Sequence, residues 1–318
     1  MLFRSCGLSL GLPVQDQSVC LYLESTLTAG ALHTTVTGNT FSSAAGDLLS
    51  IYHSGSGTGT LDVTGNTFAN THPAIATGGG GVSIYQDGLA GGTTMDLSGN
   101  SFRGAVGPGV LVTKGLGAAR QKGTFANNTI GVAGVANSGS AEGSGLKLQQ
   151  VGSGSVEWSV TGNQIRGYNN YGIEVLAGGG AAPQSGIVST VVTNNTIAEP
   201  GNTAGTIGLP KQGVHYNVGT FPGDTFDVCA DVRTNVLAAS GADAVPSAAF
   251  DYDVRLRQRQ STTIRVPGYA GANNDNTAVQ SYVAAQNSTG SPSVTTSNTV
   301  GTGGGGFVGT ACPVLPAP

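Results

Sequence analysis

The chain has 318 residues, of which only 9% are charged and 53 are glycine, and its formal net charge at pH 7 is −4. A charged fraction so far below the usual quarter disfavours a helix-rich fold, because helix surfaces normally carry many Glu, Lys and Arg side chains. Disorder also fits poorly, since the net charge is small and 38% of the residues are hydrophobic. These values favour an all-β protein with a surface of Ser, Thr, Asn and Gly.

The N-terminal stretch, residues 1–18, is interpreted as an irregular or truncated segment. It reads "MLFRSCGLSLGLPVQDQ" at its start, where Ser, Cys and Gly interrupt the apolar run before Pro13, so it is a poor signal peptide. We therefore expect this chain to be part of a larger polypeptide. No run of 18 apolar residues occurs, which predicts no membrane-spanning segment. The 13 Lys and Arg residues are dispersed, so no nucleic-acid partner is expected.

A hexapeptide repeat begins at residue 36. The segment "VTGNTF" occurs at 36–41 and 63–68, related segments follow at 97–102, 125–130, 160–165 and 192–197, and weaker copies at 232–237 and 296–300. The clear copies share one asparagine: Asn39, Asn66, Asn100, Asn128, Asn163 and Asn195. A recurring unit of roughly 30 residues indicates a repeat architecture in which neighbouring units supply the core.

A second motif lies between the asparagine motifs, at 49–55, 82–88, 110–115, 146–152, 173–179 and 214–219. Apolar and outward residues alternate in it, and glycine follows, which is the pattern of a half-buried strand and a turn. A further strand precedes each asparagine. Propeller blades need four strands in roughly 40 residues, more than these units offer. The pattern predicts a parallel β-helix of about nine coils over residues 19–274.

The asparagines are expected to form a structural ladder. Asparagine tolerates a left-handed backbone in a turn, and its amide can bond the asparagine of the next coil. The Phe or Ile two residues later is predicted to point into the interior.

The C-terminal segment, residues 275–318, is expected to hold a short helix, the last coil and a tail. Asp275 is a plausible N-cap of "DNTAVQSYVAAQ", in which Ala278, Val279, Tyr282 and Val283 have helical spacing. We expect this helix to cover the last coils, because exposed strand edges invite aggregation.

Four cysteines are present without metal-ligand spacing. The favoured pairing is Cys229 with Cys312; four unrelated buried thiols are the alternative.

The segments "GNTF" and "NNTI" resemble coils of the right-handed parallel β-helix of pectin-lyase-like proteins. Residues 252–287 and 303–313 are similar to the close of β-helical segments in very large secreted or cell-surface repeat proteins of bacteria. The resemblance implies a right-handed helix and an extracellular or cell-surface location in bacteria, but no reaction.

Two outward columns contain candidate carbohydrate-binding residues. Tyr22, Tyr52 and Tyr85 are aligned in one column, where they could stack against sugar rings or simply pack on one another. Lys147, Glu174 and His215 are aligned in the other, followed by Arg255. That row could hold an acidic glycan, or could be an ordinary surface charge row.

Asp62 and Asp96 occupy equivalent places in neighbouring units and form a weak candidate Ca²⁺ or acid–base pair. The corresponding positions in the units on either side are Thr35 and Thr124, so no third acid joins them. No catalytic residue is predicted, and no cofactor is expected apart from Ca²⁺ at this pair.

The sequence favours a structural or adhesive β-helical module of a secreted or cell-surface bacterial protein, without catalytic activity. Glycans or other surface proteins are the expected partners. The alternatives are a polysaccharide lyase or glycoside hydrolase, which rests on fold analogy alone, and a passive carbohydrate-binding module.

Overall fold

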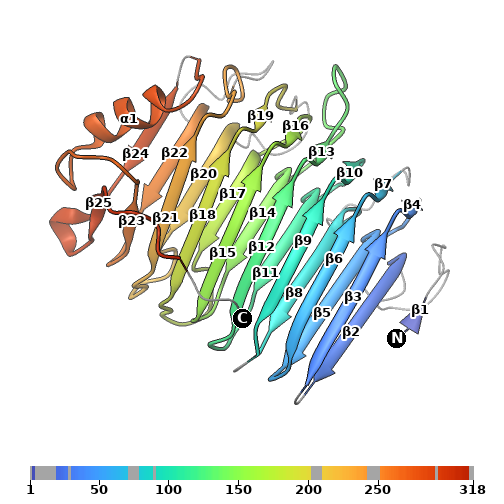
Figure 1. Ribbon diagram of the computed structural model, residues 1–318. Coiled ribbons are helices and arrows are strands. Elements are labelled where there is room, and N and C mark those ends of the chain that lie inside the picture. Colours follow the sequence, from blue (N-terminus) through green and yellow to red (C-terminus); the bar gives the residue numbers. More distant parts are fainter. Residues whose placement is uncertain are drawn as a thin grey trace.

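The computed structural model describes residues 2–3, 19–27, 30–70, 79–88, 91–201, 210–241, 251–290 and 293–314. Their strands form three sheets, called sheets A, B and C, which wind around one interior as a right-handed parallel β-helix (Figure 1). The predicted fold class is confirmed.

Sheet A has ten strands in the order β1 (Leu2–Phe3), β2 (Leu21–Leu27), β5 (Leu49–Gly55), β8 (Val82–Asp87), β11 (Val110–Lys114), β14 (Leu146–Gln150), β17 (Tyr171–Ala177), β20 (Gln212–Val218), β22 (Tyr252–Gln258) and β24 (Val294–Ser297). These strands pair in parallel, except that β1 runs antiparallel to β2. Sheet A contains the predicted alternating motif.

Sheet B has nine strands, β3 (Ala31–Thr37), β6 (Thr58–Thr64), β9 (Thr93–Ser98), β12 (Arg120–Ala126), β15 (Ser155–Thr161), β18 (Ile187–Thr193), β21 (Asp227–Arg233), β23 (Thr263–Arg265) and β25 (Gly306–Val308). Sheet C has six short strands, β4 (Thr40–Ser42), β7 (Thr67–Ala69), β10 (Ser101–Arg103), β13 (Thr129–Ile130), β16 (Gln164–Ile165) and β19 (Thr196–Ile197). The nine strands of sheet B agree with the expected number of coils. The strands of sheet C were not predicted as strands.

Inward side chains stack in columns along the rod. One column of sheet A consists of Leu23, Ile51, Ile84, Val112, Leu148, Val175, Tyr216 and Leu256. In sheet C the ring of Phe68 stacks on Phe41 and Phe102, with centroids 4.9 and 5.2 Å apart. Gly123 makes room for the buried ring of Trp158, since a Cβ there would lie 2.3 Å from that ring. Adjacent coils therefore bury one another's apolar surface.

An asparagine ladder follows the turns from sheet B to sheet C. The backbone N–H and Nδ2 of each asparagine donate to Oδ1 of the asparagine in the next coil, at 2.8–3.3 Å. Its members are Asn39, Asn66, Asn100, Asn128, Asn163, Asn195, Asn235 and Asn287. The ladder gives hydrogen-bond partners to buried amide groups and so avoids the free-energy cost of leaving them unpaired.

The left-handed residue of this turn is not the ladder asparagine, so that part of the prediction was wrong. Positive φ falls one position earlier, at Gly38, Gly65, Gly99, Asn127, Gly162, Asn194 and Thr234. Glycine and asparagine reach this conformation at low cost. The ladder position itself is determined by side-chain hydrogen bonding.

The predicted capping helix is confirmed as α1 (Asn276–Ala285), which packs beside β24 at the C-terminal end (Figure 1). Asp275 caps it by accepting a 2.9 Å hydrogen bond from the backbone N–H of Ala278, and Val279 and Val283 are buried. Asn287 follows the helix and closes the ladder by donating to the Val283 carbonyl. The weak repeat copy at 296–300 was misassigned, because it overlaps β24 of sheet A and the 3₁₀ turn η2 (Val300–Thr302).

A disulfide joins Cys229 of β21 to Cys312, with Cα atoms 5.3 Å apart. It ties the chain end to a strand 83 residues earlier. Of the segment predicted as irregular, residues 1 and 4–18 lie outside the described residues. Within the described part, no helix is long and apolar enough to span a bilayer.

Candidate functional site

The outer face of sheet A contains most of the predicted site residues. On this face Tyr52 of β5 pairs with Tyr85 of β8, and their rings stack with centroids 5.5 Å apart and planes 11° from parallel. Both rings are half-buried. A Cβ on Gly115 would lie 2.4 Å from the Tyr85 hydroxyl, so the second ring packs against the backbone of the following coil.

Tyr22 does not belong to this stack, which corrects the predicted alignment. It pairs with Ser50, and the strand neighbour of Tyr52 is Glu24. The Tyr22 hydroxyl donates to Glu24 Oε2 at 3.3 Å. The aromatic surface is therefore a pair of rings and not a three-ring ladder.

The second predicted row has the expected register. Lys147 pairs with Glu174, Glu174 with His215, and His215 with Arg255, on four consecutive strands of sheet A. Lys147 Nζ lies 3.4 Å from Glu174 Oε2, which also accepts a 2.9 Å hydrogen bond from Ser144. The carboxylate of Glu174 is nearly buried and is therefore engaged by the protein itself.

His215 is the most unusual member of the row. It is 2% exposed, and neither ring nitrogen has a hydrogen-bond partner among the residues that the structure describes. The Tyr171 ring meets it edge-on, with centroids 4.2 Å apart. Burial holds the pKa of His215 well below its usual value, and the nearby cations Arg255, Arg257, Arg259 and Lys147 lower it further. The imidazole is therefore neutral at pH 7.

Two arginines that were not predicted as site residues extend the row. Arg257 follows Arg255 on the same face of β22, and Arg259 lies just past the end of that strand. Arg259 donates to Asn217 Oδ1. Burial and the neighbouring cations lower the pKa of both Arg255 and Arg259. The alternation Arg-Leu-Arg-Gln-Arg at 255–259 is the sequence signal that could have identified this cluster.

The acids nearest to these arginines along the chain have other partners. Asp253 is 2% exposed, and its Oδ1 accepts hydrogen bonds of 3.0 Å from both the N–H and the hydroxyl of Ser240, while Oδ2 accepts one from the Gly290 N–H. Asp251 accepts a 2.8 Å hydrogen bond from the Lys211 N–H. Both carboxylates therefore accept hydrogen bonds from loop backbone.

Asp62 and Asp96 are direct neighbours on β6 and β9, as predicted. Asp62 Oδ2 lies 3.3 Å from His33 Nε2, and Asp96 accepts a hydrogen bond from Ser98. Among the described residues, no group of three or more His, Cys, Asp or Glu has an arrangement that could hold a metal ion. Each carboxylate thus has a local protein partner.

Sequence reasoning missed an inward polar column at the end of the sheet A strands, formed by Ser25, His53, Gln86, Lys114 and Gln150. Lys114 is fully buried, and its Nζ donates to the carbonyls of Gly115 and Gly117 at 3.0 and 2.9 Å. Burial lowers the pKa of Lys114 to about 8. Gln150 likewise donates to turn carbonyls. Side chains of this column thus donate hydrogen bonds to backbone carbonyls in the turns from sheet A to sheet B, which is a structural role.

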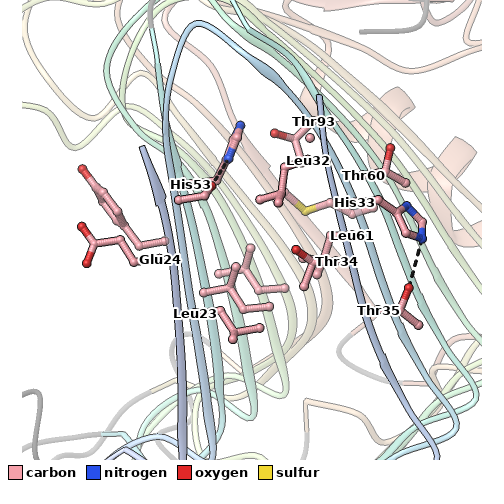
Figure 2. A pocket seen from close by; sticks show the side chains of 16 residues that line it. Leu23, Glu24, Leu32, His33, Thr34, Thr35, His53, Thr60, Leu61 and Thr93 are labelled. Carbon is pink, nitrogen blue, oxygen red and sulfur yellow. Dashed lines mark hydrogen bonds between the residues drawn. The ribbon is translucent and has the colours of Figure 1, made fainter. Parts of the chain in front are cut away.

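A cavity of about 300 Å³ lies between sheets A and B at the N-terminal end of the rod (Figure 2). Leu23 and Leu61 face into it, while Glu24 and His33 lie toward its outer sides (Figure 2). His53 Nδ1 is hydrogen-bonded to Ser25 Oγ at 2.6 Å. The cavity is mainly apolar and is part of the interior of the first coils.

The comparisons with known proteins add no relative. No protein-family model matches the chain, and neither the curated proteins nor the solved structures contain a match to it.

Proposed function

We propose that this chain is a structural and adhesive module, a rigid rod segment of a secreted or cell-surface bacterial protein. The observation that carries the proposal is the asparagine ladder, which runs from Asn39 in the first coils to Asn287 beside the capping helix. Together with the stacked core columns, it makes the module a continuous object that can hold one face outward.

The disulfide supports the extracytoplasmic setting, because disulfides persist mainly in oxidising compartments. The resemblance of the C-terminal segment to large bacterial surface proteins points the same way. The pectin-lyase-like resemblance supports a rod-shaped β-helical module and suggests polysaccharides as its partners. It supports no particular reaction, because a fold by itself specifies none.

The test uses microspheres coated with the purified chain, driven by flow over surfaces that bear immobilised polysaccharides. We expect retention above that of albumin-coated microspheres on at least one polysaccharide, without release of reducing ends or unsaturated products. Product release would show an enzyme instead. Retention equal to albumin on every surface would remove the adhesive part of the proposal.

A second candidate is passive sugar binding at the Tyr52–Tyr85 pair, since parallel stacked rings on a flat sheet offer an apolar surface to a sugar ring. Glycan-array binding that is lost in Tyr52→Ala/Tyr85→Ala supports it. Tyr22→Ala is the matched control, because Tyr22 lies outside the stack. Unchanged binding by the double variant would refute it.

A further inference from the structure

Four cationic side chains, here called the basic patch, lie on the outer face of the C-terminal half of sheet A, Lys147 on β14 and the other three on or just past β22: Lys147, Arg255, Arg257 and Arg259. All of them are half-buried, and each lies close enough to the buried ring of His215 to lower its pKa. This concentration is unusual in a chain with only 13 Lys and Arg among 318 residues and a net charge of −4.

Among the residues that the structure describes, the patch has more positive than negative charge. Lys147 pairs with Glu174, and Asp253 is buried under loop backbone. The side chain of Arg257 makes no ion pair or hydrogen bond with another residue of the described part of the chain, and the Nε of Arg259 is buried without a partner there. A protein that accumulates like charges without pairing them loses stability, which is compensated when an anion binds.

The geometry indicates the kind of anion. Arg255 and Arg257 are two residues apart on one face of β22, so their Cα atoms are about 6.6 Å apart, and Lys147 lies three strands away at about 4.8 Å per strand. Guanidinium groups on separate backbone positions approach one anion from different directions. A tetrahedral sulfate presents three oxygens to such donors, whereas the two coplanar oxygens of a carboxylate match a single guanidinium fork.

Spacing also favours a glycan over a nucleic acid. Duplex DNA presents a charge every ~1.7 Å of its axis and needs cations along its length, whereas this chain has a net charge of −4 and only 13 Lys and Arg residues. A polysaccharide with separated sulfate groups needs only a local cationic surface. The flat outer face of parallel strands can accept an extended polymer.

We propose that the basic patch on sheet A is a binding site for sulfated polysaccharide, contacted by Arg257 and Arg259 and supported by the charges of Arg255 and Lys147. The proposal names the partner of the adhesive module and rests on the proposed function for its biological setting. Binding to sulfated polysaccharide is measured on the purified chain. This binding can be absent while the rod still adheres to another surface, so the two proposals can be tested separately.

The test measures binding of the full chain to dextran sulfate by surface plasmon resonance at low and high NaCl. Neutral dextran, polygalacturonate and single-stranded DNA of similar size are the comparison polymers. We expect binding to dextran sulfate that weakens with salt, as for any charge-driven contact. Arg257→Gln/Arg259→Gln should weaken it at least about tenfold, the effect of losing even one charge-assisted hydrogen bond.

The matched control is Arg103→Gln/Arg120→Gln, which removes two exposed cations from sheets C and B and changes the net charge equally. We expect it to bind within twofold of the parent chain. Thermal unfolding of both variants shows whether each is folded. If Arg257→Gln/Arg259→Gln does not fold, Arg257→Gln alone replaces it.

Three results would overturn the proposal. The first is no binding of dextran sulfate at low salt, and the second is an equal loss of affinity in the patch and control variants. The third is polygalacturonate or single-stranded DNA binding as tightly as dextran sulfate with the same dependence on Arg257 and Arg259. Adhesion to a different polysaccharide in the flow experiment would then leave the proposed function intact without this site.

Discussion

Replacement of Asn128 by alanine tests the asparagine ladder at its most buried part. The Asn128 side chain is 1% exposed. Its Oδ1 accepts from the backbone N–H and Nδ2 of Asn100 at 2.9 and 3.2 Å, and its Nδ2 donates to the Leu97 carbonyl at 2.7 Å and to Asn163 Oδ1 at 3.0 Å. Four hydrogen bonds are lost together in Asn128→Ala.

The expected loss of stability follows from the groups that lose a hydrogen-bond partner in Asn128→Ala. The backbone N–H of Asn100, one Nδ2 hydrogen of Asn100 and the Leu97 carbonyl each lose a partner, whereas Asn163 Oδ1 keeps the Asn128 N–H at 2.9 Å. A buried group without a partner costs about 1–3 kcal/mol, so for these three groups we expect a loss of roughly 3–9 kcal/mol in the free energy of unfolding. Asn39→Ala is the matched control, because that ladder asparagine is exposed and water can replace it; we expect less than about 1 kcal/mol.

The assay is equilibrium unfolding in urea, followed by fluorescence. The chain has one tryptophan, Trp158, which is 1% exposed and packs on Gly123 close to the middle of the ladder. Its emission therefore reports on the coils that surround Asn128. Equal unfolding midpoints for Asn128→Ala and Asn39→Ala, with unchanged slopes, would refute the reasoning that the ladder stabilises the rod by satisfying buried groups.

Three other predictions concern the disulfide and two buried bases. Cys229→Ser/Cys312→Ser should lower the free energy of unfolding by roughly 4–5 kcal/mol, since the disulfide closes a separation of 83 residues, and a thermal midpoint equal to that of the parent chain would contradict this. Lys114 releases its proton near pH 8 in the folded chain but near 10.5 when unfolded, so the free energy of unfolding should rise from about pH 8 upward. Lys114→Met should abolish this rise in urea unfolding measured between pH 7 and 9.5. Identical pH profiles for the variant and the parent chain would contradict this prediction. His215 stays neutral in the folded chain while the unfolded imidazole protonates below about pH 6.5, so the free energy of unfolding should fall as the pH decreases, by up to about 1.4 kcal/mol per pH unit. His215→Gln should lose less stability per pH unit. An equal loss per pH unit in the variant and the parent chain would contradict the neutral state of His215.

The inward and outward faces of the coils could be predicted from sequence because they depend on local alternation. The apolar residues of "LSIYHSG" and "VSIYQDG" point inward in β5 and β8, as the period of two requires. The first coil shows the limit of that signal. A shift of two residues keeps every side chain on the same face, so alternation alone could not decide whether Tyr22 or Glu24 adjoins Tyr52.

The candidate site was predictable only in part. The row from Lys147 to Arg255 followed from aligning equivalent strands, but its electrostatic character did not. That character depends on which carboxylates can pair with the cations. Asp253 instead accepts hydrogen bonds from the backbone N–H groups of Ser240 and Gly290, which lie outside its own strand. Asn287 joined the ladder without a copy of the hexapeptide, since α1 delivers it to the same place.

The sequence by itself determined the β-helical fold, its coil number, its capping helix and the Asn ladder up to Asn195. These features repeat, and each copy contains its own hydrophobic alternation and turn residues. Only the tertiary structure decided the register of the first coil, the burial of His215 and the nearness of Lys147, Arg257 and Arg259 to that ring. Those properties arise between residues that are distant along the chain, and turns of variable length set which of them become neighbours.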